Sequence, residues 1–166
     1  MSSSHSSRQS IVVTGSTRGI GRGLAEELLK RGHNVAISGR SQAAVDTALA
    51  QIAGSETGGA RAMGLPCDIT KPAELRALWN AAQAAFGRID IWVNNAGISH
   101  SRQRGGEMRA ADIRAVEETN LLGMLHATQI AMQGMLAQGG GYVYNMEGFG
   151  SNGMMTPGMS LYGASK

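Results

Sequence analysis

Two residues near the end of the 166-residue chain have the types and spacing for proton transfer. Tyr162 and Lys166 are four positions apart, which in a helix places both side chains on one face. A cation beside a phenol favours the ionised oxygen. Reduction of a carbonyl needs such a proton donor on oxygen and a hydride donor on carbon, and general acid catalysis contributes roughly 10²–10⁴-fold to such a rate. Alone, the same pattern is also typical of an ordinary pair on a helix surface.

A glycine-rich stretch near the other end of the chain, residues 14–21 (TGSTRGIG), has the composition of a phosphate-binding turn. It follows an apolar run at 11–13 and leads into residues 24–29, whose apolar positions recur at helical spacing. Glycines let the backbone approach a ligand, and a helix N-terminus offers N–H groups to a pyrophosphate. The spacing is G-x-x-x-G-x-G and not the general dinucleotide fingerprint, so a tight strand-to-helix turn stays the alternative here.

The chain between these two motifs alternates predicted strands and helices. Strands are predicted at 11–13, 35–38, 60–66, 89–93 and 141–146. Helices are predicted at 24–30, from the cap Ser41 to 52, from the cap Thr70 to 86, and from 112 to about 136, with a further helix beginning at 162. This alternation implies right-handed crossovers and a parallel sheet. The predicted fold class is therefore α/β: a doubly wound, Rossmann-like parallel sheet in three α/β/α layers, with cofactor sites at the carboxyl ends of the strands.

Composition limits the other classes of protein. The length suits one domain, predicted over residues 10–166, and the short Ser-rich segment 1–9 is predicted to be a disordered leader. A net charge of +3 and only 4% aromatic residues disfavour nucleic-acid binding, and no apolar run reaches membrane-spanning length. The single Cys67 permits no internal disulfide, which fits a reducing compartment, and no metal site is predicted.

Four motifs together resemble those of the short-chain dehydrogenase/reductase family. Residues 14–21 resemble its TGxxxGxG cofactor motif, residues 94–97 its NNAG motif and residues 162–166 its YxxxK pair, while Asn120 falls where the family keeps a helix asparagine. Their order and separations fit from residue 11 onward. Family members continue beyond the lysine, so the C-terminal part of the family fold is expected to be absent. The chain ending at Lys166 is therefore expected to fold poorly and to lack activity by itself.

The resemblance implies a role for each matching residue. Tyr162 would be the general acid, Lys166 would also bond the nicotinamide ribose, and Asn120 would hold a water in the proton relay. Asp68 is also interpreted as a helix-capping residue, and both of its roles can hold. The residues implied to line the cofactor are Gly15, Ser16, Thr17, Arg18, Gly19, Ile20, Gly21, Asp68, Ile69, Asn95, Ala96 and Gly97, with Tyr162 and Lys166.

The end of the second predicted strand indicates which nicotinamide cofactor is bound. NAD-binding folds of this type place an acidic residue there, on the ribose 2′-OH. This chain instead has Gly39 followed by Arg40, and an arginine can pair with a 2′-phosphate. Arg18 in the glycine loop could approach the phosphate from the other side; the alternative is that both are solvated surface arginines. NADPH is therefore the predicted cofactor.

The segment after the fifth predicted strand departs from the family pattern. The family keeps an Asn-x-Ser-Ser run whose last serine orients the substrate carbonyl, whereas residues 145–148 here read NMEG. Ser151 is the nearest hydroxyl and is the fourth predicted catalytic residue. Three alternatives stay open: Ser151 replaces the missing serine, cofactor and tyrosine polarise the carbonyl without it, or the chain is impaired.

The same departure resembles the chlorophyll b reductases of plants and algae, NADPH-dependent members of the family with an acidic residue and glycines in this segment. The similarity covers residues 145–151, 156–157 and 162–166. It implies reduction of the 7-formyl group of chlorophyll(ide) b to hydroxymethyl. Met154, Met155 and Met159 in the same loop suit a large flat apolar ligand, although methionines also fill ordinary loops.

Two other functions stay open at this stage: a generic carbonyl or 3-oxoacyl reductase, and a non-catalytic cofactor-binding fragment. The predicted partner is a small-molecule substrate, either a porphyrin-type pigment or another carbonyl compound. A homo- or hetero-oligomer is expected for the full-length protein. The resemblance implies a chloroplast location, with the cytoplasm as the alternative.

Overall fold

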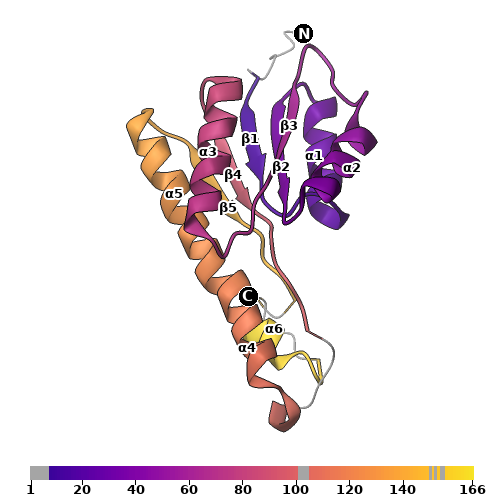
Figure 1. Cartoon of the computed structure of the whole chain (residues 1–166), viewed down its shortest axis with the longest axis vertical. Coiled ribbons are helices and arrows are strands. Elements are labelled where there is room, and N and C mark those ends of the chain that lie inside the picture. The colour runs from indigo at the N-terminus through magenta and orange to yellow at the C-terminus, as the bar shows by residue number, and fades with distance from the viewer. Residues whose placement is uncertain (1–7, 101–104, 150, 152, 154–155) are drawn as a thin grey trace.

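A five-stranded parallel sheet organises the chain (Figure 1). The computed structural model describes residues 8–100, 105–149, 151, 153 and 156–166. The strand order is β3-β2-β1-β4-β5, which reverses direction beside β1 and confirms the predicted doubly wound α/β fold. The strands are β1 (Ser10–Val13), β2 (Asn34–Gly39), β3 (Ala62–Pro66), β4 (Ile91–Asn94) and β5 (Tyr142–Asn145).

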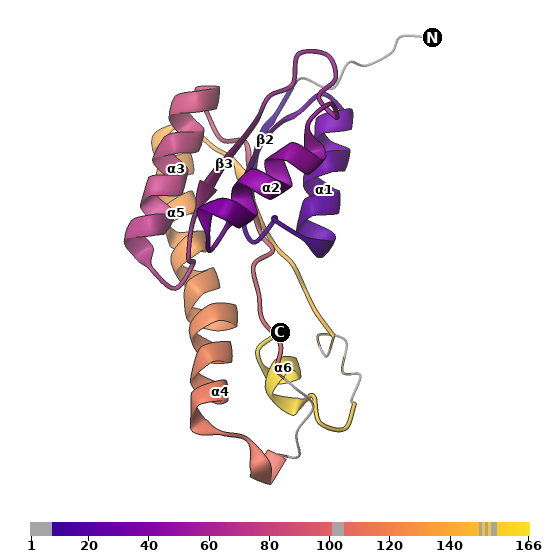
Figure 2. The same cartoon turned by 45° about the vertical axis from the view of Figure 1, so that its right-hand side comes forward.

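Helices cover both faces of the sheet (Figure 2). Alternation along β1 directs Ile11 and Val13 to one face, where the core includes α1 (Gly19–Lys30) and α2 (Gln42–Ile52). Val12 points to the opposite face, toward α3 (Pro72–Phe86) and α5 (Met124–Ala137). Because both faces are covered, every residue of β1 and β2 is buried.

The helix that follows β3 begins differently from the prediction, whereas the one after β2 agrees with it. Ser41 caps α2 by accepting a hydrogen bond from Ala44 N at 3.3 Å. The prediction that Thr70 caps α3 is wrong, because the N-cap position is Lys71, without a side-chain cap. Thr70 instead donates its N–H and its hydroxyl to Asp68 Oδ1, at 3.0 and 2.8 Å. Because the helix begins at Pro72, the cap position is one residue after Thr70, and the Thr70 hydroxyl belongs to the turn before the helix.

The long helix predicted at 112–136 is not uniform. It consists of α4 (Ala110–Val116), a π-helical segment η2 (Glu117–Gly123) and α5, and a 3₁₀ turn η1 (Gly105–Glu107) precedes it. Such π segments occur frequently at functional sites because the inserted residue changes which side chains face inward. The chain ends in the short helix α6 (Ser160–Ala164), and α4 and α6 both project beyond the carboxyl edge of the sheet (Figures 1 and 2).

The first described residues join loops at the amino edge of the sheet. Arg8 Nε donates to Gly32 O at 3.2 Å, its Nη2 to Gly58 O, and Gln9 N donates to His33 Nδ1. Both residues belong to the segment predicted as a leader, of which positions 1–7 lie outside the described residues. None of the helices described above combines the length and apolar character needed to cross a bilayer.

Cys67, directly after β3, is expected to resist alkylation while the protein is folded. It is 3% exposed, and burial, followed by the charges of Glu74 and Asp68, raises the pKa of its thiol to about 12 from an ordinary 9.0. Since the thiolate is the reactive form, labelling at pH 8 should be slowed about a thousandfold relative to the unfolded chain. Timed iodoacetamide labelling with and without denaturant measures this ratio. Equal rates in both conditions would contradict the burial of this thiol.

Candidate active site

The glycine loop after β1 leaves the amino end of α1 open. Gly15 and Gly19 have φ of +62° and +58°, a conformation that side-chain-bearing residues rarely adopt. The helix begins at Gly19, five residues before the apolar periodicity predicted, and its N-cap Arg18 makes no side-chain cap bond. The first-turn N–H groups therefore have no capping side chain and can donate hydrogen bonds to an anionic ligand.

The glycine loop and the segment after β4 form one hydrogen-bonded unit. Thr14 Oγ1 accepts bonds from the N–H groups of Asn95 and Ala96, both at 3.1 Å. Asn95 Nδ2 donates in return to Thr14 O and Gly15 O, at 2.9 and 3.0 Å. The backbones touch: a Cβ at Gly15 would lie 2.6 Å from Ala96 Cα. Two predicted cofactor motifs some 80 residues apart thus meet at the edge where the strand order reverses.

The end of β2 is tied to the same loop. Ser16 N donates to Ser38 O at 2.8 Å, and Ser38 N donates to Ser16 Oγ at 3.0 Å. The Thr17 side chain packs on Gly39, where a Cβ would lie only 2.5 Å from Thr17 Cγ2. This contact brings Arg40, which follows Gly39, beside the glycine loop with its side chain exposed. The Oγ of Ser38 is buried and has no hydrogen-bond partner among the described residues.

The remaining predicted cofactor residues divide between exposed and buried positions. Arg18 is exposed, and Ile20, 73% exposed, extends into solvent. Ile69 is buried against Gly123 of η2, and a Cβ added at Gly123 would lie 2.9 Å from the Ile69 side chain. Burial raises the pKa of Asp68, but the hydrogen bonds from Thr70 and the charges of Lys71 and Arg40 outweigh it, so the net pKa lies below the usual value. Asp68 therefore carries a negative charge close to Arg40.

The π segment turns Asn120 toward the loop that follows β4. Its side chain is 3% exposed; Oδ1 accepts from Ile98 N at 2.8 Å and Nδ2 donates to Ile98 O at 2.9 Å. A second Nδ2 hydrogen bond reaches Ser165 Oγ at 2.8 Å. Asn120 thus joins the chain after β4 to the end of α6.

Tyr162 and Lys166 pack together against Gly148, the position at which the family carries its serine. A Cβ at Gly148 would lie 2.6 Å from Tyr162 Oη and 2.9 Å from Lys166 Cγ. Lys166 Nζ lies 6.0 Å from the centre of the Tyr162 ring and donates a long hydrogen bond, 3.5 Å, to Met146 O. Burial lowers the pKa of Lys166. The absent side chain at Gly148 is therefore what lets the phenol approach the backbone after β5.

Ser151 has a partner of its own. Its hydroxyl donates to Glu147 Oε2 at 3.2 Å, its N–H donates to Gly148 O, and both side chains are exposed. The predicted catalytic serine is therefore bonded to Glu147, one of the two residues that replace the family serines. Of the loop methionines, Met154 and Met155 lie outside the described residues.

Asn94 belongs to the NNAG motif but is not among the predicted site residues, and the structure gives it a central position. Its Nδ2 donates to Thr128 Oγ1 and Asn145 Oδ1, both at 2.8 Å, and its Oδ1 accepts from Trp92 Nε1 at 2.8 Å. These bonds join β4 to α5 and to the end of β5. The alternation Trp92–Asn94 along one strand face was visible in the sequence, but the partners on α5 and β5 were not.

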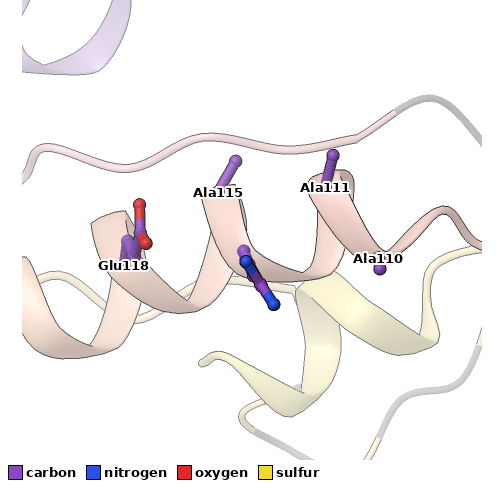
Figure 3. A pocket seen from close by; sticks show the side chains of 5 residues that line it. Ala110, Ala111, Ala115 and Glu118 are labelled. Atoms are coloured by element: carbon purple, nitrogen blue, oxygen red, sulfur yellow. The ribbon is translucent and has the colours of Figure 1, made fainter.

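A separate hollow of about 440 Å³ lies along α4 and is lined by three alanines and two charged side chains (Figure 3). The residues that line it are Ala110, Ala111, Arg114, Ala115 and Glu118. None of them is a predicted site residue. Among the described side chains, no three histidines, cysteines or acidic residues are grouped closely enough to hold a metal ion.

Comparison with known proteins identifies the class. A model of the family described as short chain dehydrogenase matches residues 9–166, so this chain belongs to that family, as the motifs predicted. One similar relative is the chloroplastic chlorophyll(ide) b reductase NOL of Arabidopsis thaliana. It is 41% identical over 158 residues, which are 94% of this chain and 45% of that protein.

Two solved structures share the fold closely. The F189W variant of actinorhodin polyketide ketoreductase with NADPH is 31% identical, with a TM-score of 0.86 over 95% of this chain and 59% of that one. NAD⁺-bound xylitol dehydrogenase is 25% identical, with a TM-score of 0.87 over the same shares. This chain thus spans less than half of NOL and about three fifths of the two structures, and the family binds nicotinamide cofactors of both kinds.

Proposed function

We propose that this chain forms the cofactor-binding and catalytic part of an NADPH-dependent reductase that converts a formyl group to hydroxymethyl. The observation that carries the proposal is the packing of Tyr162 and Lys166 on Gly148, with the Lys166 ammonium beside Gly97. Tyr162 donates its phenolic proton to the carbonyl oxygen. Lys166 balances the charge that remains on the phenol and holds the nicotinamide ribose. The Met146 carbonyl and Asn120 keep the ammonium in place, the latter through the proposed relay water.

The residues fit the cofactor. The uncapped start of α1 would donate its N–H groups to a pyrophosphate, and the close approach of Gly15 to Ala96 places both loops where they would border the same cofactor. Ser16, Thr17, Gly19 and Gly21 complete the loop. Asp68 and Ile69 would flank the adenine, and Asn95 and Gly97 would line the ribose. Bound there, reduced nicotinamide supplies the hydride that the carbonyl carbon receives. The products are a primary alcohol and the oxidised cofactor.

Arg40 supports NADPH over NADH as the cofactor. It is exposed beside the glycine loop, at the strand end where NAD-binding folds carry a carboxylate. Arg40→Asp should reverse the preference, because it removes the cation for a 2′-phosphate and supplies an acceptor for a 2′-OH. A charged hydrogen bond of roughly 1.5–3 kcal/mol corresponds to about a tenfold or greater loss of NADPH affinity.

Fluorescence titration of wild type and variant with both cofactors measures this preference. Arg76→Asp, which makes the same charge change at an exposed position of α3 away from the loop, is the matched control and should leave the order unchanged. Tighter binding of NADH than of NADPH by the wild type would refute the proposal for Arg40.

The proposed substrate is chlorophyll(ide) b, reduced at its 7-formyl group. Its support is the 41% identity to chlorophyll(ide) b reductase NOL, together with the NMEG segment that replaces the family serines. The second candidate is a generic carbonyl or 3-oxoacyl reductase, supported by the likeness to a polyketide ketoreductase. Chlorophyll b and an acetoacetyl thioester, assayed side by side with the full-length protein, separate the two. Turnover of the thioester alone would overturn the pigment assignment.

If the Ser151 hydroxyl replaces the missing serine, Ser151→Ala should lower kcat by about 3- to 10-fold. This range corresponds to the loss of one net hydrogen bond of roughly 0.5–1.5 kcal/mol. Glu147→Gln, measured in parallel, tests the partner that accepts from that hydroxyl. An unchanged kcat in Ser151→Ala removes the serine from the mechanism. The carbonyl would then be held by Glu147 or by the Tyr162–Lys166 pair alone.

The proposed location is the chloroplast, with the cytoplasm as the alternative, and the support is the description of NOL as chloroplastic. A homo- or hetero-oligomer is proposed for the full-length protein. Its support is a row of apolar side chains on η2 and α5 that are about half exposed: Leu121, Leu122, Leu125 and Met132. Size-exclusion chromatography with light scattering tests the oligomeric state.

A further inference from the structure

Every polar atom of the Asn120 side chain is used. Oδ1 accepts from Ile98 N, and Nδ2 donates to Ile98 O and to Ser165 Oγ. An amide nitrogen carries two hydrogens, so the Ser165 hydroxyl takes the one that Ile98 leaves. Because Asn120 is 3% exposed, removal of that hydroxyl leaves a buried donor without its partner.

The Ser165 hydroxyl makes two bonds at once. It accepts from Asn120 and donates to Tyr162 O at 2.8 Å, which one hydrogen and two lone pairs allow. A bond to the carbonyl three residues earlier is common at helix ends and is local. The bond from Asn120 is not local, since it crosses 45 positions of sequence. Ser165 therefore links the π segment to the last turn of α6.

This link lies close to the ammonium of Lys166. A Cβ at Gly97 would lie 3.3 Å from both Asn120 Oδ1 and Lys166 Nζ, so amide and ammonium border the same small space. The helix α6 has only five residues, too few to hold its own geometry. Among the described residues, the two that directly follow this helix are bonded to the rest of the fold through their side chains, by the Asn120–Ser165 bond and the long Lys166–Met146 bond.

We propose that Ser165 is a positioning residue for the Tyr162–Lys166 pair. Its hydroxyl sets the rotation of α6 against η2 and so holds the ammonium of Lys166 at the carbonyl of Met146. In its kinetic part this inference rests on the proposed function.

The test uses the full-length protein and three variants. Ser165→Ala removes the hydroxyl, Ser165→Thr keeps it, and Ser160→Ala removes an exposed hydroxyl at the other end of the same helix. Ser165→Ala should lower kcat/KM by about 10- to 100-fold, the effect of misplacing a catalytic group by about 1 Å. It should also change the pH–rate profile, which Ser165→Thr should leave as in the wild type, because the pH dependence of the rate reports the groups that transfer the proton. Ser165→Thr should recover most of the rate, and Ser160→Ala should match the wild type.

NADPH affinity gives a readout that does not require turnover. Ser165→Ala should weaken it about 3- to 10-fold, and Ser165→Thr should restore it, because a displaced Lys166 loses one net hydrogen bond to the ribose. If the wild type binds NADPH but reduces neither test substrate, the proposed function fails and these affinities alone decide the role of Ser165. If Ser165→Ala does not fold, Ser165→Cys, which keeps a weak donor, replaces it. The NADPH affinity of Ser165→Cys must then lie between that of Ser165→Thr and a value about ten times weaker than that of the wild type. Wild-type values for Ser165→Ala or Ser165→Cys, no recovery with threonine, or an equal loss in Ser160→Ala would each overturn the inference.

Discussion

Replacement of Tyr162 by phenylalanine is expected to lower kcat by at least about 100-fold in the full-length protein and to leave NADPH affinity almost unchanged. General acid catalysis is worth roughly 10²–10⁴-fold, and the change removes only the proton donor. The phenol lies against Gly148 and the ribose contact proposed for Lys166 remains, so the cofactor site stays intact. Single-turnover oxidation of NADPH with an aldehyde, together with fluorescence titration of the cofactor, measures both quantities.

Tyr144→Phe is the matched control for this experiment. Tyr144 lies on β5, is 54% exposed, and loses the same oxygen in the variant. Its rate should equal that of the wild type. If Tyr162→Phe kept more than a tenth of the wild-type rate, Tyr162 would not be the general acid, and the exposed carboxylate of Glu147 would be the next group to test.

Gly21→Ala is expected to weaken NADPH binding strongly, by about 5- to 150-fold. A Cβ at Gly21 would overlap Asn95 Nδ2 and lie 2.9 Å from Gly15 O. Those groups form the hydrogen bond that joins the glycine loop to the segment after β4, so the added methyl group forces the two loops apart. Overpacking of this kind costs roughly 1–3 kcal/mol. If the unbound loop relaxes and so avoids the whole strain, binding of NADPH must restore it, and the affinity falls by about 5- to 150-fold.

Gly23→Ala provides a control in the same helix. Gly23 is exposed, and a Cβ there would meet nothing within 4 Å. The change should leave NADPH affinity unchanged and raise stability by up to about 1 kcal/mol, because alanine favours the helix over glycine. Thermal melting and NADPH titration of both variants measure these effects. Equal affinities for Gly21→Ala and Gly23→Ala would show that the contact between the loops does not shape the cofactor site.

The π segment explains how a buried asparagine comes to sit in the middle of a long helix. Asn120 is a poor residue for a helix interior, because its amide competes with backbone groups. The segment from Glu117 to Gly123 changes the helical register, which turns that amide toward Ile98 and Ser165. Gly123 then allows η2 to pack against Ile69. The departure from α-helical geometry therefore has a structural purpose in the candidate site.

Local patterns in the sequence were enough to predict the architecture. The β-branched run at 11–13 and the strand–helix alternation predicted a parallel doubly wound sheet, which the strand order confirms. The cap at Ser41 was predicted because such caps depend on neighbouring residues only. Thr70 was assigned wrongly because the spacing does not fix the first helical residue: α3 begins at Pro72, which makes Lys71 the N-cap and leaves the Thr70 hydroxyl to donate to Asp68. The roles assigned to Tyr162, Lys166, Ser151 and Arg40 stay predictions.

The sequence by itself therefore determined the order of the elements, the family and the residue types available for chemistry, because periodicity and short motifs are properties of neighbouring residues. Tertiary structure alone decided which of these residues meet. Asn95 is hydrogen-bonded to Gly15, 80 positions away in sequence, and Asn120 to Ser165, 45 positions away. Tyr162 packs against Gly148. Such contacts form where the carboxyl ends of β1, β4 and β5 meet the start of α6. Packing of the two cores sets how these elements converge, and no single segment of the sequence encodes that packing.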